Sequence, residues 1–196
     1  MSKIIIHGGF FSESSTNIET KIAKQQALLR IVKDSYAYLQ NHSALETVVY
    51  AVSQLEDDEL FNAGIGSQIQ SDGKIRMSAS LMDGESQKMS GVINIEEVKN
   101  PIQVAQVLMQ VDDRILGGSG ATNFARKYGF EPFSTEIPQR RAEYEAKLAS
   151  LGTGTVGCVA LDNNGKIAVA TSTGGKGFEI PGRISDSATV AGNYAN

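Results

Sequence analysis

Two apolar segments near the end of the chain constrain its fold more than any other feature. Residues 156–161 and 167–172 are rich in Val, Ile and Ala, and the sequence Asp162-Asn163-Asn164-Gly165 lies between them. Apolar runs on either side of such a turn are typical of a β-hairpin. We therefore predict two paired antiparallel strands, a pairing that would bring Thr173 back toward Thr155.

The rest of the chain alternates strands and helices. We expect a buried strand over 3–7, helices over about 18–40 and 44–55, a three-strand meander over 67–95, helices from 101, over 121–128 and over 139–150, and then the hairpin. The second helix has a capping box, Ser43 with Glu46, at its start, and the acidic run 56–59 indicates a solvated helix end. This order predicts an α/β fold with sheets between helix layers. A length of 196 residues suits one domain over 1–196.

Composition excludes several classes of protein. Lys and Arg number 18 against 22 Asp and Glu, a net charge of −4, so we expect no nucleic-acid partner. No apolar run approaches the ~20 residues needed to span a bilayer, so we expect no membrane partner. The single cysteine, Cys158, forbids an internal disulfide and, with only two histidines, argues against zinc. The expectation is a cytoplasmic protein in which Cys158 is a small core residue.

A threonine at the start of the predicted hairpin is a candidate nucleophile. Thr155 lies between Gly154 and the strand, in the run Gly152-Thr153-Gly154-Thr155-Val156-Gly157. A Thr hydroxyl needs a base beside it, and cleavage between Gly154 and Thr155 would supply one, the freed α-amino group. Glycine before that bond permits the unusual backbone geometry that cleavage requires. The alternative interpretation is an ordinary Gly/Thr turn into a strand.

The glycine-rich segment after the hairpin holds a second candidate pair. Arg183 and Asp186 are three residues apart in the sequence Pro181-Gly182-Arg183-Ile184-Ser185-Asp186-Ser187. Arginine presents a planar fork to a carboxylate, and aspartate accepts hydrogen bonds from an ammonium group. The pair thus suits the α-carboxylate and α-amino groups of an amino-acid substrate. The alternative is a surface ion pair, worth ~0–1 kcal/mol.

Several motifs along the chain resemble those of the plant-type L-asparaginase/isoaspartyl peptidase family. They occur in the family's order, and together they are far more specific than any one alone. The motifs are Ile6-His7-Gly8-Gly9, Leu60-Phe61-Asn62-Ala63-Gly64-Ile65-Gly66, Met82-Asp83-Gly84, Thr155-Val156-Gly157, Thr171-Ser172-Thr173-Gly174-Gly175, Gly182-Arg183-Ile184-Ser185-Asp186-Ser187 and Gly192-Asn193-Tyr194-Ala195-Asn196.

This resemblance implies a fold, a processing event and an assembly. The fold would be the four-layer αββα sandwich of N-terminal-nucleophile hydrolases. Self-cleavage at Gly154-Thr155 would divide the chain into an α-subunit part, 1–154, and the start of a β-subunit part, 155–196. These parts would assemble as a dimer of αβ units. No organic cofactor is implied.

The resemblance also implies roles for individual residues. Thr155 would be the nucleophile, with its freed amine as the base, and Thr173 would hydrogen-bond near it. Asn62 would support the site through contacts near Thr155 and help form the oxyanion environment. Arg183 would hold the substrate α-carboxylate and Asp186 the α-amino group. The substrate would be a small molecule, L-asparagine or a β-aspartyl (isoaspartyl) dipeptide.

The loop over 55–65 resembles the family's stabilisation loop, which binds a structural sodium ion. Backbone carbonyl oxygens suit such a hard cation, although an ordinary loop is the alternative. The residues that would supply those carbonyls are Leu55, Glu56, Asp58, Phe61, Ala63 and Ile65.

The sequence also departs from the family pattern. The family's later Thr-Gly-Thr-Gly-Glu segment is absent, Ser185 replaces a usual Gly, and the segment before Thr155 is short. We therefore expect an αββα domain that lacks its C-terminal portion. Two functions remain open at this point: an active amidohydrolase, and a catalytically inactive relative that acts as an interaction module or is a remnant.

Overall fold

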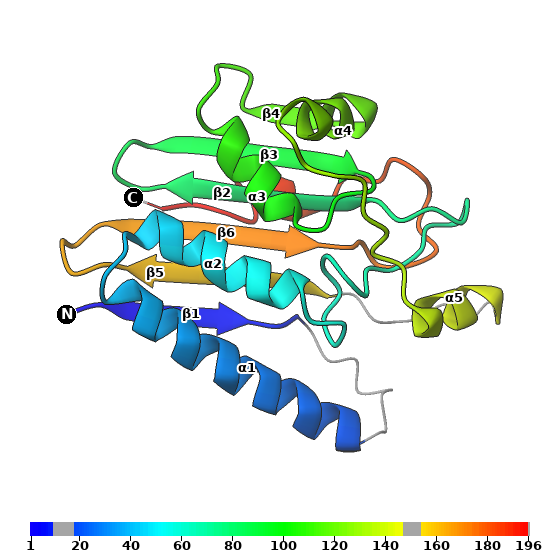
Figure 1. Cartoon of the computed structure of the whole chain (residues 1–196), viewed down its shortest axis with the longest axis horizontal. Helices are drawn as coiled ribbons and strands as arrows, with labels where there is room; N and C mark the ends of the chain where they lie inside the picture. The colour runs from blue at the N-terminus through cyan, green and yellow to red at the C-terminus, as the bar shows by residue number, and fades with distance from the viewer. Residues whose placement is uncertain (10–17, 147–153, 196) are drawn as a thin grey trace.

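The computed structural model describes residues 1–9, 18–146 and 154–195. Their elements follow one another in the order that Figure 1 labels. They are β1 (Lys3–His7), α1 (Ile18–Leu39), α2 (Ala44–Glu56), β2 (Met77–Asp83), β3 (Lys88–Ile95), α3 (Pro101–Leu108), β4 (Ile115–Gly117), α4 (Gly118–Lys127), α5 (Pro138–Glu145), β5 (Thr155–Leu161), β6 (Ile167–Thr173) and the short 3-10 helix η1 (Asp186–Ala188). The chain is thus a mixed α/β protein, as predicted.

The six strands form one sheet in the order β1-β5-β6-β2-β3-β4. The predicted hairpin is confirmed, because β5 pairs antiparallel with β6 and Thr155 lies opposite Thr173. The hairpin turn is fixed by Asp162, whose Oδ1 accepts hydrogen bonds from the backbone N of Asn164 (2.8 Å) and Lys166 (3.0 Å). β1 and β2 flank the hairpin: β1 pairs antiparallel with β5, and β2 pairs antiparallel with β6.

Helices α1, α2 and α3 lie on one face of this sheet, which we call the helix face (Figure 1). α2 begins at the expected capping box: Ser43 Oγ accepts from the Glu46 N at 3.2 Å, and Glu46 Oε2 accepts from the Ser43 N at 2.9 Å. Alternate strand residues pack beneath these helices, among them Leu81, Val156 and Cys158, which are all buried. Burial of this apolar layer is the main stabilising contribution of the fold.

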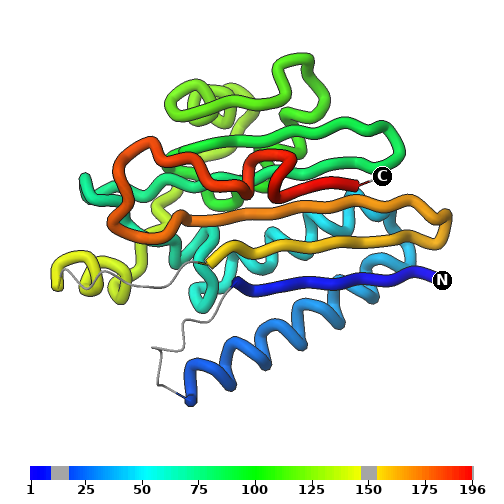
Figure 2. Tube along the Cα trace, turned by 180° about the vertical axis from the view of Figure 1, so that it is seen from behind, coloured from blue at the N-terminus to red at the C-terminus, as the bar shows by residue number. Residues whose placement is uncertain are grey.

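The other face of the sheet, which we call the open face, is covered in part by the segment after β6 (Figure 2). The strand side chains on the open face form rows that run across neighbouring strands. The row at the start of β5 consists of Thr155, Thr173 and Ser78. The second row consists of His7, Gly157, Thr171 and Ser80. The third row consists of Ile5, Val159, Val169 and Met82. Two rows are therefore largely polar, while the third is apolar and leaves Ile5 72% exposed.

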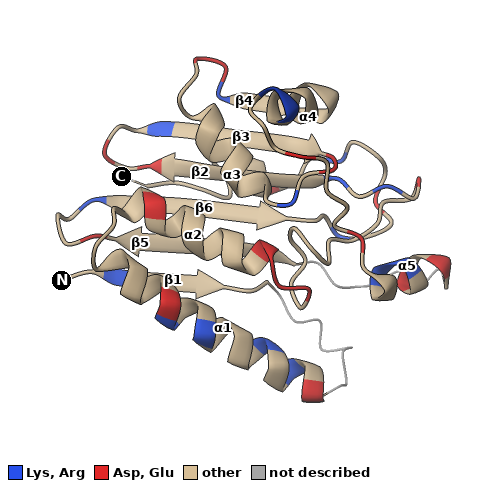
Figure 3. Ribbon diagram, viewed as in Figure 1, with Lys and Arg blue, Asp and Glu red and all other residues tan. Residues whose placement is uncertain are grey.

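Charged residues occur mainly in the helices and loops, as the colours of Figure 3 show. The central strands β5 and β6 contain no charged residue. This distribution follows from the cost of burying an unpaired charge in the middle of a sheet.

Three sequence-based expectations differ from the structure. Residues 67–95 contain two strands, β2 and β3, where a three-strand meander was predicted. The short β4 was not predicted; it pairs parallel with β3 at the sheet edge. The run 56–59 is not wholly solvated, because the Glu56 side chain is completely buried and its Oε1 accepts from the Ile102 N of α3 at 3.1 Å.

The helix predicted over 139–150 corresponds to α5, and the last residues of that range lie outside the described part of the chain.

Candidate functional site

The predicted site residues converge at one end of the central hairpin. β5 begins at Thr155 and β6 ends at Thr173, so their antiparallel register places these two threonines side by side. Thr173 is buried and Thr155 is partly buried. The structure thus brings together the two threonines that the sequence singled out.

The carbonyl oxygen of Gly154, just before Thr155, accepts two side-chain hydrogen bonds. Thr173 Oγ1 donates at 2.9 Å and Asn62 Nδ2 donates at 3.2 Å. Asn62 is itself anchored on both sides: its Oδ1 accepts from the Gln68 N at 3.0 Å, and its carbonyl accepts from the Gly174 N at 2.9 Å. Two fixed donors on one carbonyl oxygen would favour negative charge on that oxygen.

Close backbone packing surrounds the same peptide bond. Gly9 has φ +90°, and a Cβ there would lie 3.0 Å from the Gly154 Cα and 3.3 Å from the Thr155 N. A side chain at Gly9 would therefore combine strain with a steric conflict at the Gly154-Thr155 bond. On the next row, the absent side chain of Gly157 makes room for the His7 ring, whose Nε2 lies 2.4 Å from where a Cβ would be.

His7 is a titratable neighbour of this bond. Its ring hydrogen-bonds to the Thr155 backbone, which raises the pKa, but the stronger effect is partial burial, which lowers the pKa below the ordinary histidine value. The neutral form of the His7 ring is therefore favoured. The only cysteine, Cys158, lies on the helix face, where burial raises the pKa of its thiol to about 12. A thiol with that pKa is not a nucleophile at neutral pH.

Arg183 and Asp186 are exposed residues of the segment after β6, and Asp186 is the first residue of η1. Among the described residues the two side chains form no ion pair with each other. The surface ion pair considered as the alternative is thus not formed. Both charged groups remain accessible to a ligand, and Asp186 directly precedes Ser187, which contacts Thr155.

The loop after α2 curls so that its carbonyl groups approach its glycines. A Cβ at Gly64 (φ +51°) would lie 2.3 Å from the Glu56 carbonyl oxygen, and one at Gly66 (φ +89°) would lie 3.0 Å from the Phe61 carbonyl oxygen. The Glu56 oxygen also accepts from the Ile65 N at 2.7 Å. Burial raises the pKa of the Glu56 side chain to about 8. The described residues hold no group of three or more His, Cys, Asp or Glu side chains suited to a metal ion.

Sequence reasoning missed two residues of this site. The hydroxyl of Ser187 donates to Thr155 Oγ1 at 3.3 Å, and Asn193 donates to the Ser187 carbonyl at 3.1 Å. Both residues lie in motifs quoted above, directly after Asp186 and Gly192. Their partners, however, are distant along the chain: Ser187 contacts a residue 32 positions away, and Asn193 one 6 positions away. A signal for Ser187 was its position in the same short motif as Arg183 and Asp186.

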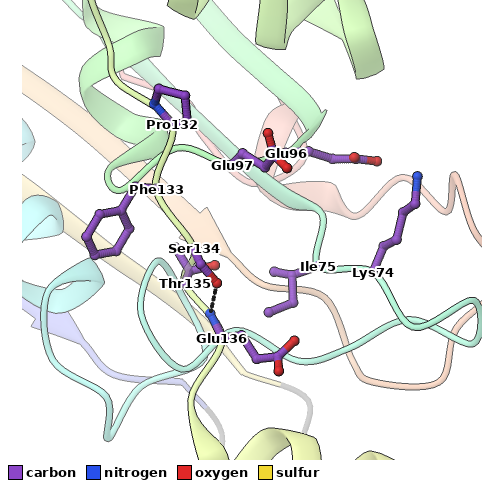
Figure 4. A pocket seen from close by; sticks show the side chains of 9 residues that line it. All are labelled: Lys74, Ile75, Glu96, Glu97, Pro132, Phe133, Ser134, Thr135 and Glu136. Carbon is purple, nitrogen blue, oxygen red and sulfur yellow. Dashed lines mark hydrogen bonds between the residues drawn. The ribbon is translucent and has the colours of Figure 1, made fainter.

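A hollow of about 380 Å³ lies elsewhere, beside the loop that follows α4 (Figure 4). None of the predicted site residues lines it. Its acids are partly neutralised, since Glu96 pairs with Arg76 at 2.7 Å and Glu136 pairs with Arg141. The lining residues are Lys74, Ile75, Glu96, Glu97, Pro132, Phe133, Ser134, Thr135 and Glu136.

Fold and site together define an α/β protein with a threonine-lined site around a Gly-Thr peptide bond. The family model described as asparaginase matches residues 1–149 and 133–196. The chain therefore belongs to the asparaginase family, in agreement with the resemblance seen in its motifs.

Relatives with curated names are named as isoaspartyl peptidases, L-asparaginases or both. The chain is 46% identical to the isoaspartyl peptidase/L-asparaginase of Synechocystis sp., over 98% of this chain and 64% of the relative. It is 37% identical to the isoaspartyl peptidase of Escherichia coli, over 98% and 67%, and 35% identical to the plant-type L-asparaginase of Pyrobaculum calidifontis, over 95% and 67%. The chain thus spans about two thirds of the length of these relatives. Within the described ranges, no helix is long and apolar enough to cross a membrane.

Proposed function

We propose that this chain is an amidohydrolase that cleaves itself at Gly154-Thr155 and then uses Thr155 to hydrolyse L-asparagine, β-aspartyl dipeptides, or both. The observation that carries the proposal is the carbonyl oxygen of Gly154, the residue directly before Thr155, which accepts hydrogen bonds from Thr173 and Asn62. Its relatives are named for the same two activities.

Self-cleavage would proceed as an N-to-O acyl shift. The Thr155 Oγ1 attacks the Gly154 carbonyl carbon, negative charge develops on the carbonyl oxygen, and the Thr173 and Asn62 donors stabilise that charge. The C–N bond then breaks, the hydroxyl proton passes to the departing nitrogen, and an ester joins Gly154 to Thr155. Water hydrolyses this ester, which leaves a Gly154 carboxylate and a free Thr155 α-amino group.

Turnover of substrate would use the groups that cleavage produces. The Thr155 amine, with a pKa near 8 for a free α-amino group, accepts the proton of the hydroxyl as it attacks the substrate amide. Arg183 would hold the substrate α-carboxylate and Asp186 its α-ammonium group, and both side chains are exposed for this. The amide nitrogen leaves as ammonia or as an amino acid, and water releases aspartate from the acyl-enzyme.

The full architecture would contain a second layer of sheet. An αββα sandwich requires that the open face pack against another sheet, and exposed Ile5 and Val159 on that face support this arrangement. We assign residues 1–154 to the α-subunit part and 155–196 to the start of the β-subunit part, with a dimer of αβ units as the assembly. A single buried cysteine suits a reducing compartment, which supports a cytoplasmic location.

A structural sodium ion in the loop over 55–65 is also part of the proposal. The convergence of carbonyl groups on Gly64 and Gly66 supports it, since backbone oxygens are the ligands a hard cation takes. The ion would order the loop that carries Asn62. The melting temperature should then rise with NaCl and rise less with choline chloride at equal ionic strength; equal responses to the two salts would contradict the site.

Thr155→Ala tests the function directly. The purified wild-type chain should separate into two pieces on denaturing electrophoresis, with a new N-terminus at Thr155 by mass spectrometry, and Thr155→Ala should stay intact. The matched control is Thr122→Ala, which changes a threonine of α4 whose hydroxyl hydrogen-bonds to the backbone of Glu96 and Gly118, away from the site, and should leave cleavage at the wild-type rate. A wild-type chain that remains intact and turns over neither substrate would favour the alternative, an inactive relative that acts as an interaction module.

A further inference from the structure

Ser187 makes a contact that the proposed chemistry has not used. It is the middle residue of η1 and is completely buried. Its Oγ donates to Thr155 Oγ1 at 3.3 Å, slightly longer than the usual O–H···O range of about 2.5–3.0 Å. Within the described part of the chain, no other side chain is recorded hydrogen-bonding to the Thr155 hydroxyl.

The backbone of Ser187 is held far more tightly than its hydroxyl. Its carbonyl oxygen accepts from Ser80 Oγ at 2.6 Å, from Thr171 Oγ1 at 2.6 Å and from Asn193 Nδ2 at 3.1 Å. Asn193 Nδ2 also lies 2.5 Å from Ser80 Oγ and 2.7 Å from Thr171 Oγ1. We call these three side chains the Ser187 clamp; they come from β2, β6 and the segment after η1, and all are buried.

The clamp and the hydroxyl therefore have separable roles. The clamp acts through the carbonyl, which every residue type possesses, and so it would survive replacement of the Ser187 side chain. Among the residues that the structure describes, the hydroxyl hydrogen-bonds only to Thr155, the first residue of β5. A structural role alone would need the carbonyl and would leave the hydroxyl unexplained.

The two atoms that must meet in self-cleavage are held by different groups. Thr173 and Asn62 fix the Gly154 carbonyl, but they do not fix the χ1 angle of Thr155. A threonine side chain has three staggered χ1 positions, which place its hydroxyl in different directions. The strand backbone narrows this choice, and a hydrogen bond to the hydroxyl can fix it; Ser187 makes such a bond.

We propose that Ser187 is a positioning residue, whose hydroxyl, fixed by the Ser187 clamp, holds Thr155 Oγ1 in one rotamer beside the Gly154-Thr155 bond. This inference rests on the proposed role of Thr155 as the nucleophile. Holding one rotamer keeps the hydroxyl near the carbonyl carbon that it attacks, and small losses of alignment are known to cost up to about a hundredfold in rate.

The test compares Ser187→Ala with Ser185→Ala in the full chain. Ser185 is a matched control because its hydroxyl, two residues away, is also buried and has no hydrogen-bond partner in the described parts of the chain. Ser187→Ala should slow the appearance of the Thr155 N-terminus about ten- to a hundredfold, while Ser185→Ala should not slow it. Ser187→Thr, which keeps a hydroxyl, should recover part of the rate.

A second measurement does not depend on cleavage. In chain labelled with ¹³C at the threonine methyl groups, the three-bond couplings of Thr155 should report one χ1 rotamer in the wild type and averaged rotamers in Ser187→Ala. If the wild type fails to cleave but shows this difference, the proposed function fails while the positioning role stands.

Either of two results would overturn the positioning role. One is wild-type couplings for Thr155 in Ser187→Ala. The other is a cleavage rate in Ser187→Ala that falls no further than that of Ser185→Ala. Thr171→Val, which removes one donor of the Ser187 clamp and keeps the Ser187 hydroxyl, should give an intermediate loss of cleavage rate.

Discussion

The two faces of the sheet use the same strands for different purposes. On the helix face, alternate residues such as Leu81, Val156 and Cys158 are small or apolar and completely or nearly completely buried. On the open face, the residues between them include Thr155 and Thr171, whose hydroxyls make the contacts of the site. Adjacent residues of one strand thus lie on opposite faces, one in the core and the next in the site.

This difference shows how the site is kept rigid without being apolar. The helix face fixes the strands through an apolar layer, so the open face can carry hydroxyl and amide groups without losing its geometry. The polar groups are restrained by hydrogen bonds to one another and to backbone carbonyls, as in the contacts of Thr171 and Asn193 to Ser187. Buried polar networks of this kind specify one arrangement when their members are satisfied.

The largest contrast between the faces should appear in adjacent residues of β2. Leu81 packs in the main core on the helix face, and Met82 belongs to a cluster of three buried residues on the open face. Leu81→Ala should lower the free energy of unfolding by about 2–5 kcal/mol, and Met82→Ala by about 1 kcal/mol. Urea denaturation of both variants measures the difference. Equal losses would mean that the open face is packed as tightly as the helix face.

A smaller effect should come from His7, on the open face. Its pKa is lowered in the folded protein, so as the pH falls below about 6.5 the unfolded chain binds a proton that the folded chain does not yet bind. Stability should therefore be fully present above pH 6.5 and be lost as the pH falls toward the folded pKa. His7→Gln should lose less stability than the wild type between pH 7.5 and 5.5, measured by the urea midpoint. Parallel curves for the two proteins would show that His7 does not titrate differently on folding.

Local sequence patterns predicted the parts of the fold that local physics determines. The hairpin was predictable because its turn and apolar strands are contiguous, and the register of Thr155 with Thr173 followed from it. The start of α2 was predictable because a capping box needs only four residues. β4 was not, because Ile115–Gly117 is three residues long and forms only by pairing with β3.

The hairpin alone predicted that Thr173 would lie near Thr155, but the role of Asn62 was predictable only from the resemblance of its motif to that of a family. Thr155, Thr173 and Asn62 were named in advance, and the structure brings them around the Gly154 carbonyl. The clamp could not be read from the sequence, since Asn193 and Ser80 are 113 residues apart along the chain. The burial of Glu56 could not be predicted either, because it depends on the packing of α3 against the end of α2.

The strand order has a consequence for a chain broken before Thr155. Of this sheet, the later piece would hold β5 and β6, and these lie between β1 on one side and β2 on the other, both from the earlier piece. The six-stranded sheet would therefore be built from both pieces, with the two later strands inserted between strands of the earlier piece. Such a molecule would keep its size on a native column and come apart only in denaturant. Its halves, made separately, would each need the other in order to fold.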